Sequence, residues 1–176
     1  MNNNNRSNIM KLNAGCGNDI KEGWINLDFN FHEGVDVIHN LNEVPYPFQD
    51  NTFDCIVMNM VFEELDKWEE IILELYRISK PNAVWSIIVP YYHCRTAFNP
   101  YHKMFFHLDT FSVFSDVNRV HTSRMKPILY KITKRELVPN NLIAQLIPKK
   151  YRNYIGMIFG EMYKQIIFEM KIIKNK

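Results

Sequence analysis

The chain has 176 residues, of which 47% are hydrophobic and 14% are aromatic, a composition that excludes an intrinsically disordered protein and suits one domain around one core. The 3 cysteines, Cys16, Cys55 and Cys94, lie far apart in the sequence, which excludes a disulfide framework and a zinc knuckle. The net charge of +2 conceals an acidic part, residues 1–118 with 8 Lys and Arg against 16 Asp and Glu, and a basic part, residues 119–176 with 13 against 3.

Residues 1–8 are polar and without period, and we expect them to form a disordered tail before a single domain, residues 9–176. No charged leader and no apolar run of membrane-spanning length is visible, so we expect a cytoplasmic protein without a transmembrane segment. Short runs rich in apolar and β-branched residues are typical of strands. They cover residues 9–14, 23–30, 34–42, 54–62, 83–90, 127–137 and 164–174.

Helical patterns lie between these strands. Apolar residues at helical spacing predict a helix over residues 67–79, and Lys80-Pro81-Asn82 is typical of a helix stop. Residues 141–162 predict a helical segment that is interrupted at Pro148, and residues 100–116 predict a helix with an irregular lead-in. This alternation indicates an α/β fold: an open, mostly parallel sheet with an antiparallel C-terminal strand and helices on both faces.

Ligands of open α/β sheets bind outside the carboxyl ends of the strands, at the point where the strand order reverses. Glycines and polar residues gather at or just after the predicted strand ends, namely Gly15, Gly17, Asp28, Asn40, Asn59 and Tyr91. Because parallel strands end at the same edge of a sheet, the sequence predicts a binding site built from these residues.

A Gly-x-Gly turn after a first strand serves three classes of ligand. A phosphate-binding P-loop is excluded, because Gly17 is followed by "NDIKEGW" and not by the required Gly-Lys-Ser/Thr ending. A dinucleotide fingerprint needs a third glycine, where this chain has Ile20, and an acidic residue roughly 20 positions on, so the earlier Asp28 disfavours NAD. S-Adenosylmethionine needs a close backbone approach to its amino-acid part and a carboxylate for its ribose hydroxyls, which the glycine turn and Asp28 supply.

The segments "LNAGCGND", "GWINLDF", "VDVIHNLN" and "PYPFQDNTFDCIVMNMVFEELDKWEEIILELYRISKPNAVWSIIVP" stand in this order. The series resembles the class I S-adenosylmethionine-dependent methyltransferases, and more narrowly the small type-11 enzymes, several of which are associated with surface-polysaccharide and glycan genes. The resemblance covers about residues 10–109. It implies a Rossmann-like fold, S-adenosyl-L-methionine as the cofactor, and in-line methyl transfer (EC 2.1.1 type) to a small-molecule or glycan-type acceptor.

The resemblance also assigns the cofactor contacts. The glycine motif, which faces the methionine part, falls on Asn13, Ala14, Gly15, Cys16 and Gly17. The remaining contacts are the ribose-binding Asp28, Phe29 beside the adenine, Asn40 and Leu41 at the adenine edge, and Asn59 and Met60 at the end of the fourth strand. The C-terminal part of the domain from about residue 95, which contains the basic part, is expected on the acceptor side.

The resemblance constrains the catalytic residues less than it constrains the cofactor contacts. "NPYHKMFF", residues 99–106, resembles a family segment over the acceptor side, which makes His102 a candidate general base; a histidine that fixes an aromatic loop is the structural alternative. The family often reads L-E-H after strand four, where this chain has Phe62-Glu63-Glu64. Glu64 is therefore a second candidate, with a helix-start carboxylate as its alternative.

Tyr91, Tyr92 and His93 follow the fifth strand and are expected to bind the acceptor, with core packing of the tyrosines as the alternative. We expect no metal site, because the histidines and cysteines of residues 93–107 lack zinc-ligand spacing. The basic part offers a face for an anionic acceptor or an anionic lipid surface, and no nucleic-acid motif is present.

Two other functions stay open. A short connection between the first two strands leaves too few residues for a full helical crossover, which favours a non-catalytic methyltransferase-fold binding module that acts through its basic C-terminal face. A nucleotide-sugar or nicotinamide enzyme on a related fold is disfavoured by Ile20 and by the position of Asp28. The sequence leaves the oligomeric state open.

Overall fold

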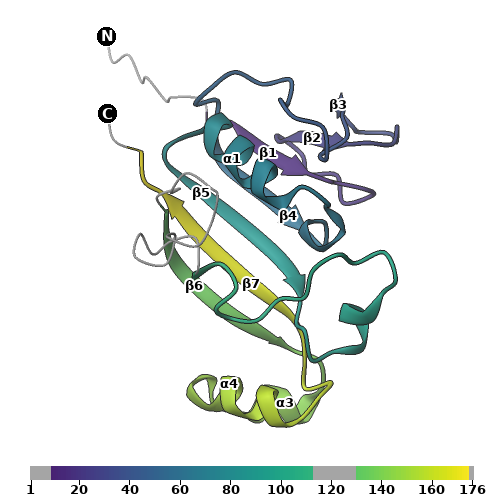
Figure 1. Ribbon diagram of the computed structural model, residues 1–176, viewed down its shortest axis with the longest axis vertical. Helices are drawn as coiled ribbons and strands as arrows, with labels where there is room; N and C mark the ends of the chain where they lie inside the picture. Colours follow the sequence, from purple (N-terminus) through teal and green to yellow (C-terminus); the bar gives the residue numbers. More distant parts are fainter. Residues whose placement is uncertain (1–8, 113–129, 175–176) are drawn as a thin grey trace.

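The computed structural model describes residues 9–112 and 130–174. The predicted tail, residues 1–8, lies outside the described residues. The rest forms a 7-stranded sheet with the order β3-β2-β1-β4-β5-β7-β6 (Figure 1). The strands are β1 (Lys11–Ala14), β2 (Ile25–Asp28), β3 (Val37–Ile38), β4 (Phe53–Asn59), β5 (Ser79–Pro90), β6 (Tyr130–Pro139) and β7 (Tyr163–Ile172).

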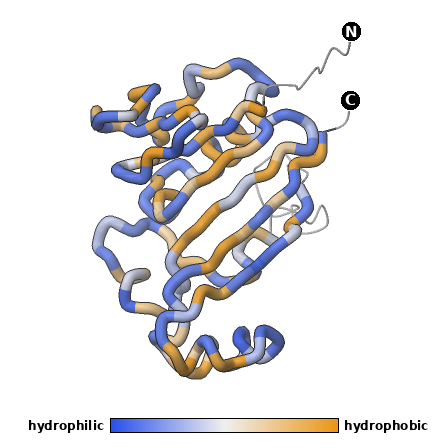
Figure 2. The backbone as a smooth tube through the Cα atoms, turned by 180° about the vertical axis from the view of Figure 1, so that it is seen from behind, coloured by the Kyte–Doolittle hydropathy of each residue, from blue (hydrophilic) through white to orange (hydrophobic). Residues whose placement is uncertain are grey.

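The pairing confirms the predicted mixed sheet. The pairs that link β3, β2, β1, β4 and β5 are parallel, whereas β7 runs antiparallel to both β5 and β6. Seen from behind, hydrophobic and hydrophilic residues alternate along β6 and β7 (Figure 2). This period of two buries one face of each strand, because successive side chains point to opposite sides of a sheet.

Helix α1 (Trp68–Ile78) forms where the sequence predicts it. Its first turn carries Glu69 and Glu70, and its last turn carries Arg77, which suits the helix dipole at both ends. Helix α1 lies against the sheet (Figure 1). The buried side chains that α1 and the sheet contribute to the common core include Ile71, Leu75, Ile78, Ile56, Trp85 and Ile87.

The predicted helix stop at Lys80-Pro81-Asn82 is confirmed, because α1 ends at Ile78, and these three residues already belong to β5. The register against β4 shifts here: Ser79 pairs with Phe53, and the next pair is Val84 with Cys55. Residues 80–83 therefore form an irregularity, where a proline without an N–H is tolerated. The Ser79 hydroxyl closes it by donating to the Leu75 carbonyl oxygen (2.7 Å) and accepting from the Trp85 indole N–H (2.7 Å).

The connection between β6 and β7 is helical, as predicted, and it is interrupted at Pro148. Helix α3 (Leu142–Leu146) begins at the Asn141 side chain, which accepts from the Ala144 N–H, and Pro148 is the N-cap of α4 (Lys149–Ile158). Because β6 runs in the direction of β5, this helical pair lies at the edge of the sheet where β5 ends, as Figure 1 shows.

Two other connections are irregular. Residues 15–24, between β1 and β2, form turns in place of a crossover helix. Residues 100–111 form turns and extended segments with one parallel bridge, Tyr91 to Phe106. The end of the helix predicted over residues 100–116 lies outside the described residues. Short 3-10 helices follow the carboxyl ends of β4 and β5, namely η1 (Phe62–Glu64) and η2 (Arg95–Phe98).

Candidate functional site

A cavity of about 540 Å³ opens at the carboxyl ends of β1, β2 and β4. This is within the range of roughly 300–1,000 Å³ that small-molecule sites occupy. It lies where the strand order changes from the β1–β2–β3 half to the β4–β5 half, which is the place where open α/β sheets bind ligands. The cavity is lined by Gly15, Cys16, Gly17, Asp28, Phe29, His39, Asn40, Leu41, Asn42, Asn59, Met60, Val61, Glu64 and Leu65.

The glycine turn after β1 is fixed to β2. The backbone N–H groups of Gly15 and Cys16 both donate to the Leu27 carbonyl oxygen, at 2.8 and 3.0 Å. Gly15 has a φ of 70°, and a Cβ on it would lie 2.5 Å from Cγ2 of Val61. Only glycine suits this position, because a side chain meets both an unfavourable backbone conformation and a neighbouring chain segment.

Asp28 ends β2 and points its carboxylate at the glycine turn. Its Oδ2 accepts from the Gly17 N–H (2.8 Å) and its Oδ1 accepts from the Asn30 N–H (3.0 Å), while the residue is 6% exposed on the cavity wall. Each carboxylate oxygen can accept a second hydrogen bond, so Asp28 has capacity left for ligand hydroxyls. Burial, and then the Asp28 charge, raise the pKa of the Cys16 thiol above its ordinary value.

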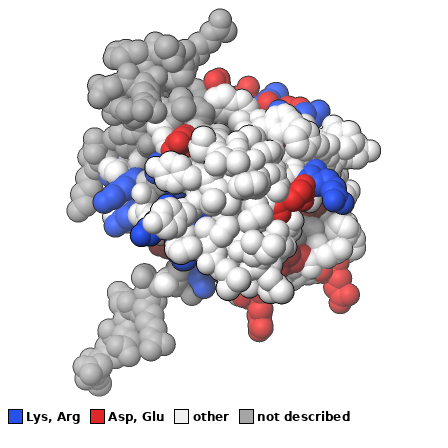
Figure 3. Space-filling model, turned by 90° about the horizontal axis from the view of Figure 1, so that it is seen from below, with Lys and Arg blue, Asp and Glu red and all other residues white. Residues whose placement is uncertain are grey.

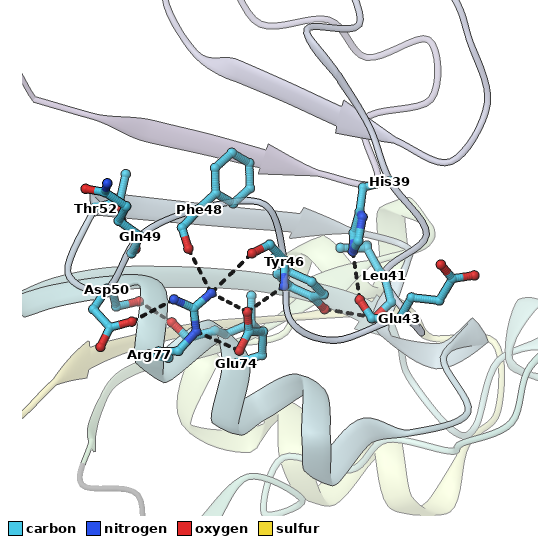
Figure 4. Close-up of polar contacts among 12 residues, drawn as sticks. His39, Leu41, Glu43, Tyr46, Phe48, Gln49, Asp50, Thr52, Glu74 and Arg77 are labelled. Carbon is cyan, nitrogen blue, oxygen red and sulfur yellow. Dashed lines mark hydrogen bonds and ion pairs between the residues drawn. The ribbon is translucent and has the colours of Figure 1, made fainter.

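The loop after β3 forms the opposite wall through His39, Asn40, Leu41 and Asn42. Asn40 shapes this loop, because its Oδ1 accepts from the Asn42 N–H at 3.0 Å. The Leu41 carbonyl oxygen accepts from the buried Tyr46 hydroxyl (2.9 Å), and the His39 ring packs edge-on against Tyr46. The wall therefore depends on the position of Tyr46 (Figure 4).

Tyr46 is held in turn by α1. Its backbone N–H donates to Oε1 of Glu74 (2.6 Å), and Arg77 donates to Glu74, to Asp50 and to the carbonyl oxygens of Tyr46 and Phe48 (Figure 4). Burial raises the pKa of Glu74, but the hydrogen bonds from Arg77 and Tyr46 outweigh it, so the pKa lies below its ordinary value. A buried ion pair thus fixes the loop that carries one wall of the cavity.

The third wall comes from the end of β4. Met60 has a φ of 56°, which is uncommon for a residue with a side chain and clusters at functional sites. Its N–H donates to the Ile88 carbonyl oxygen (2.8 Å), so β5 holds the turn in this conformation. Val61 follows and packs against Gly15.

Nine of the eleven residues predicted to contact the cofactor lie on this cavity, and Asn13 and Ala14 do not. Asn13 is buried within the sheet, where its amide donates to Oδ1 of Asn26 (3.1 Å) and to the Asp19 carbonyl oxygen (2.7 Å). The sequence analysis did not predict four of the cavity residues, namely His39, Asn42, Val61 and Leu65. Their position directly beside predicted site residues in the loops after β3 and β4 is the signal that could have identified them.

The two residues predicted for catalysis, Glu64 and His102, lie in different environments. Glu64 is exposed and lies on the cavity wall. His102 is not among the lining residues, and its Nδ1 is buried without a hydrogen-bond partner in the part of the chain that the structure describes. Glu64 is thus the candidate base that is closer to the cavity, and the role of His102 stays a prediction.

Tyr91, Tyr92 and His93 lie outside the cavity, at the end of β5. Tyr91 is 1% exposed and packs edge-on against Tyr92 and Tyr163. The His93 Nδ1 lies 3.0 Å from the Gly156 carbonyl oxygen of α4. Their assignment to the acceptor stays a prediction, and for Tyr91 the core-packing alternative describes its present surroundings.

The neighbour of Glu64 is a functional candidate that the sequence analysis missed. Glu63 is fully buried, and neither carboxylate oxygen bonds to another residue of segments 9–112 and 130–174. Burial, with the charge of Glu64 adding to it, raises the pKa of Glu63 to about 7. No sequence pattern marks this residue, because its burial follows from the loop of residues 100–106 that packs over it through the Lys103 N–H (2.7 Å to the Glu63 carbonyl oxygen).

Neither a metal cluster nor a membrane span was found in the part of the chain that the structure describes. No three His, Cys, Asp or Glu side chains gather as metal ligands among the described residues. None of the helices in residues 9–112 and 130–174 has the length and apolar character to cross a membrane.

Comparison with known proteins agrees with this geometry. The methyltransferase domain family matches residues 16–87. The structure resembles S-adenosylmethionine-dependent methyltransferases from Archaeoglobus fulgidus (17% identity, 94% of this chain and 86% of that chain, TM-score 0.64) and from Aquifex aeolicus (17%, 94% and 83%, TM-score 0.57). It also resembles the [4+2]-cyclase SpnF (13%, 95% and 75%, TM-score 0.56). No curated protein sequence matches this chain.

The fold is therefore the Rossmann-like methyltransferase fold. The match to the methyltransferase domain family covers residues 16–87, which include Gly17, Asp28 and Asn59 of the cavity. The similarity to a cyclase shows that the fold alone does not identify the reaction. The reaction depends on the residues of the site.

Proposed function

We propose that this protein is a methyltransferase that uses S-adenosylmethionine to methylate a small-molecule or glycan-type acceptor. The observation that carries the proposal is the position of Asp28. It meets the glycine turn on the wall of a cavity of about 540 Å³, whose other walls come from the ends of β3 and β4. A turn with close backbone approach beside a carboxylate suits a ligand that combines an amino acid with a ribose.

The cavity residues have different roles in this proposal. Gly15, Cys16 and Gly17 face the amino-acid part of the cofactor, and Asp28 faces the ribose. Phe29, Asn40 and Leu41 face the adenine, and Asn59 and Met60 form the turn at the end of β4. Bound S-adenosylmethionine supplies an electrophilic methyl group, and the protein supplies position and proton removal from the acceptor. Glu64 is the proposed base for that proton, a role supported by its exposure and by its position among the residues that line the cavity.

Calorimetry with S-adenosylhomocysteine, the product form of the cofactor, tests the proposal. We expect the wild type to bind it and Asp28→Ala to bind it at least about tenfold more weakly, since a charge-assisted hydrogen bond is worth roughly 1.5–3 kcal/mol. Binding of NAD in place of S-adenosylhomocysteine, or equal binding by both proteins, contradicts it. Methyl release in the presence of glycan-type and small-molecule acceptors then identifies the acceptor class.

A non-catalytic binding module is the second candidate. Two observations favour it: residues 15–24 lack a crossover helix, and a glutamate stands at position 64 where the family often has a histidine. Cofactor binding with no methyl transfer to any acceptor of the panel, and with equal cofactor binding by Glu64→Gln, assigns the protein to this second function.

A further inference from the structure

The helical connection between β6 and β7 exposes large apolar side chains. Six of them, on α3, on α4 and just after it, are between 56% and 84% exposed: Leu142, Ile143, Leu146, Tyr154, Ile158 and Phe159. We call the surface formed by these residues the α3–α4 face. Large contiguous apolar patches on the surface of a folded protein mark interaction sites.

The opposite sides of the same helices explain this exposure. Ala144 of α3 is fully buried, and Gly156 of α4 packs so closely that a Cβ on it would lie 2.9 Å from the Tyr163 ring and 3.2 Å from the Tyr91 hydroxyl. The small residues thus face the protein, and the large apolar ones face outward. In Figure 1 the two helices form one end of the molecule, and viewed from that end most of the surface is uncharged, with both basic and acidic side chains around it (Figure 3).

The charge of the helical connection is positive on balance, although Glu136 and Glu161 flank it. The sequence between Glu136 and Glu161 contains Lys149, Lys150 and Arg152 and no acidic residue. Arg152 is structural, because its Nε donates to the Ile147 carbonyl oxygen at the end of α3 (3.0 Å). Lys149 pairs with Glu136 at 3.0 Å but keeps 77% of its side chain exposed, and Lys150 is exposed beside the Tyr151 ring.

We propose that the α3–α4 face docks the protein on an anionic membrane surface. Apolar side chains next to lysines, with tyrosines among them, are the composition of segments that lie in the headgroup region of a bilayer. The exposed lysines reach anionic headgroups while their alkyl chains stay over apolar surface. This binding is peripheral and needs no spanning helix.

A second copy of this chain fits the face less well. Two copies that met through their α3–α4 faces would bring the lysines of one copy towards those of the other, and Glu136, which pairs with Lys149 of its own chain at 3.0 Å, offsets only part of that charge. Like charges that face each other across an interface are unfavourable. An anionic lipid surface supplies the missing opposite charge.

Hydrogen bonds connect the helical segment that carries the α3–α4 face to the predicted acceptor side. His93 contacts the Gly156 carbonyl oxygen of α4, and the backbone N–H of Arg95 donates to the Glu161 carboxylate just before β7. Docking through α3 and α4 therefore holds the carboxyl end of β5 next to the lipid. An acceptor that resides at the membrane reaches this edge of the sheet.

Vesicle co-sedimentation of the full chain tests the proposal. We expect the wild type to sediment with vesicles of phosphatidylcholine and phosphatidylglycerol but not with phosphatidylcholine alone, and to be released by salt. The double variant Ile143→Ser/Leu146→Ser should partition about tenfold more weakly or worse, because it removes apolar area from the contact. Lys149→Glu/Lys150→Glu, which keeps the large apolar side chains of the face, should lose the preference for anionic vesicles.

Matched controls sit elsewhere on the surface. Ile9→Ser removes a 61% exposed apolar side chain before β1, and Lys131→Glu reverses an exposed charge at the start of β6; both should bind vesicles like the wild type. Thermal melts of each variant show whether it folds, and the lysine variant keeps the test valid if the serine variant unfolds.

Three results overturn the proposal. The first is a wild type that stays in the supernatant with anionic vesicles at every salt concentration. The second is equal partitioning of both double variants and the wild type. The third is a wild-type dimer in sedimentation velocity that Ile143→Ser/Leu146→Ser converts to a monomer while no protein binds vesicles, which assigns the face to self-association.

Discussion

The carboxylate of Asp28 accepts a hydrogen bond from the backbone N–H of Gly17 over a donor–acceptor distance of 2.8 Å. This contact joins the end of β2 to the turn after β1, which are the two features that the sequence analysis paired by chemistry alone. One side chain therefore shapes the glycine turn and presents its remaining acceptor sites to the cavity. Removal of its charge should change ligand binding more than it changes the fold.

Asp28→Asn tests this expectation with a side chain of the same shape. The neutral amide loses the charge-assisted contacts, so we expect S-adenosylhomocysteine to bind about 10–100-fold more weakly by calorimetry. Asp36→Asn is the matched control: Asp36 Oδ2 accepts from the Asn26 N–H (2.7 Å) but does not line the cavity. It should lower the melting temperature and leave the affinity unchanged; equal affinities for wild type and Asp28→Asn would contradict the ribose assignment.

Gly15→Ala should destabilise the protein more than Gly23→Ala does. Both glycines have positive φ, 70° and 73°, but only the Cβ at position 15 meets another residue, at 2.5 Å from Val61. The backbone conformation costs roughly 1–2 kcal/mol in either variant, and the overlap adds about 1–3 kcal/mol at position 15. Urea unfolding measures the difference, and Val61→Ala in the Gly15→Ala background should recover part of it. Equal destabilisation by the two alanines would refute the close contact.

Arg77→Ala should cost roughly 3–5 kcal/mol of unfolding free energy, because it leaves the buried Glu74 carboxylate without its partner. The Glu74 side chain is 8% exposed, whereas that of Asp50, the other partner of Arg77, is 69% exposed. Asp50→Ala should therefore cost less than about 1 kcal/mol. Arg77→Ala should also weaken S-adenosylhomocysteine binding, since the loop of residues 39–42 loses its support. A variant no less stable than Asp50→Ala would show that the pair is not structural.

Stability should fall as the pH rises from the ordinary pKa of Glu63, 4.5, to its folded pKa of about 7. In this window the folded protein keeps the proton and the unfolded chain has lost it, so protonation favours the folded state at low pH and the advantage is gone above the folded pKa. Urea unfolding across this range measures the slope. Glu63→Gln should flatten it, and the exposed neighbour variant Glu64→Gln should keep it. A slope that survives in Glu63→Gln would assign it to another group.

The strands and α1 could be predicted from the sequence because local patterns record one-sided burial. The alternation along β6 and β7 and the apolar stripe on α1 indicate which side of each element faces the core. This holds regardless of which residues form the rest of the core. The helix end before Lys80-Pro81-Asn82 could be predicted for the same reason. The irregular start of β5 could not, because it depends on the register between β4 and β5, which no local signal encodes.

The cavity shows the same division. Gly15, Gly17, Asp28, Asn40 and Asn59 could be placed together from the sequence, because parallel strands end at one edge and each of these residues ends a strand or begins its loop. The burial of Glu63, the outward side of α3 and α4, and the anchoring of residues 39–50 on Arg77 could not. Each depends on a contact between segments that are far apart in the chain.

The sequence by itself determined the order of the elements, the chemistry of the glycine turn and the acidic residue after it. Only the tertiary structure decided which predicted residues share the cavity, since Asn13 turned into the sheet and Tyr91 into an aromatic cluster. The physical reason is range: propensity and periodicity act over a few residues, whereas the burial and charge environment of a side chain are set by whatever the rest of the chain packs against it.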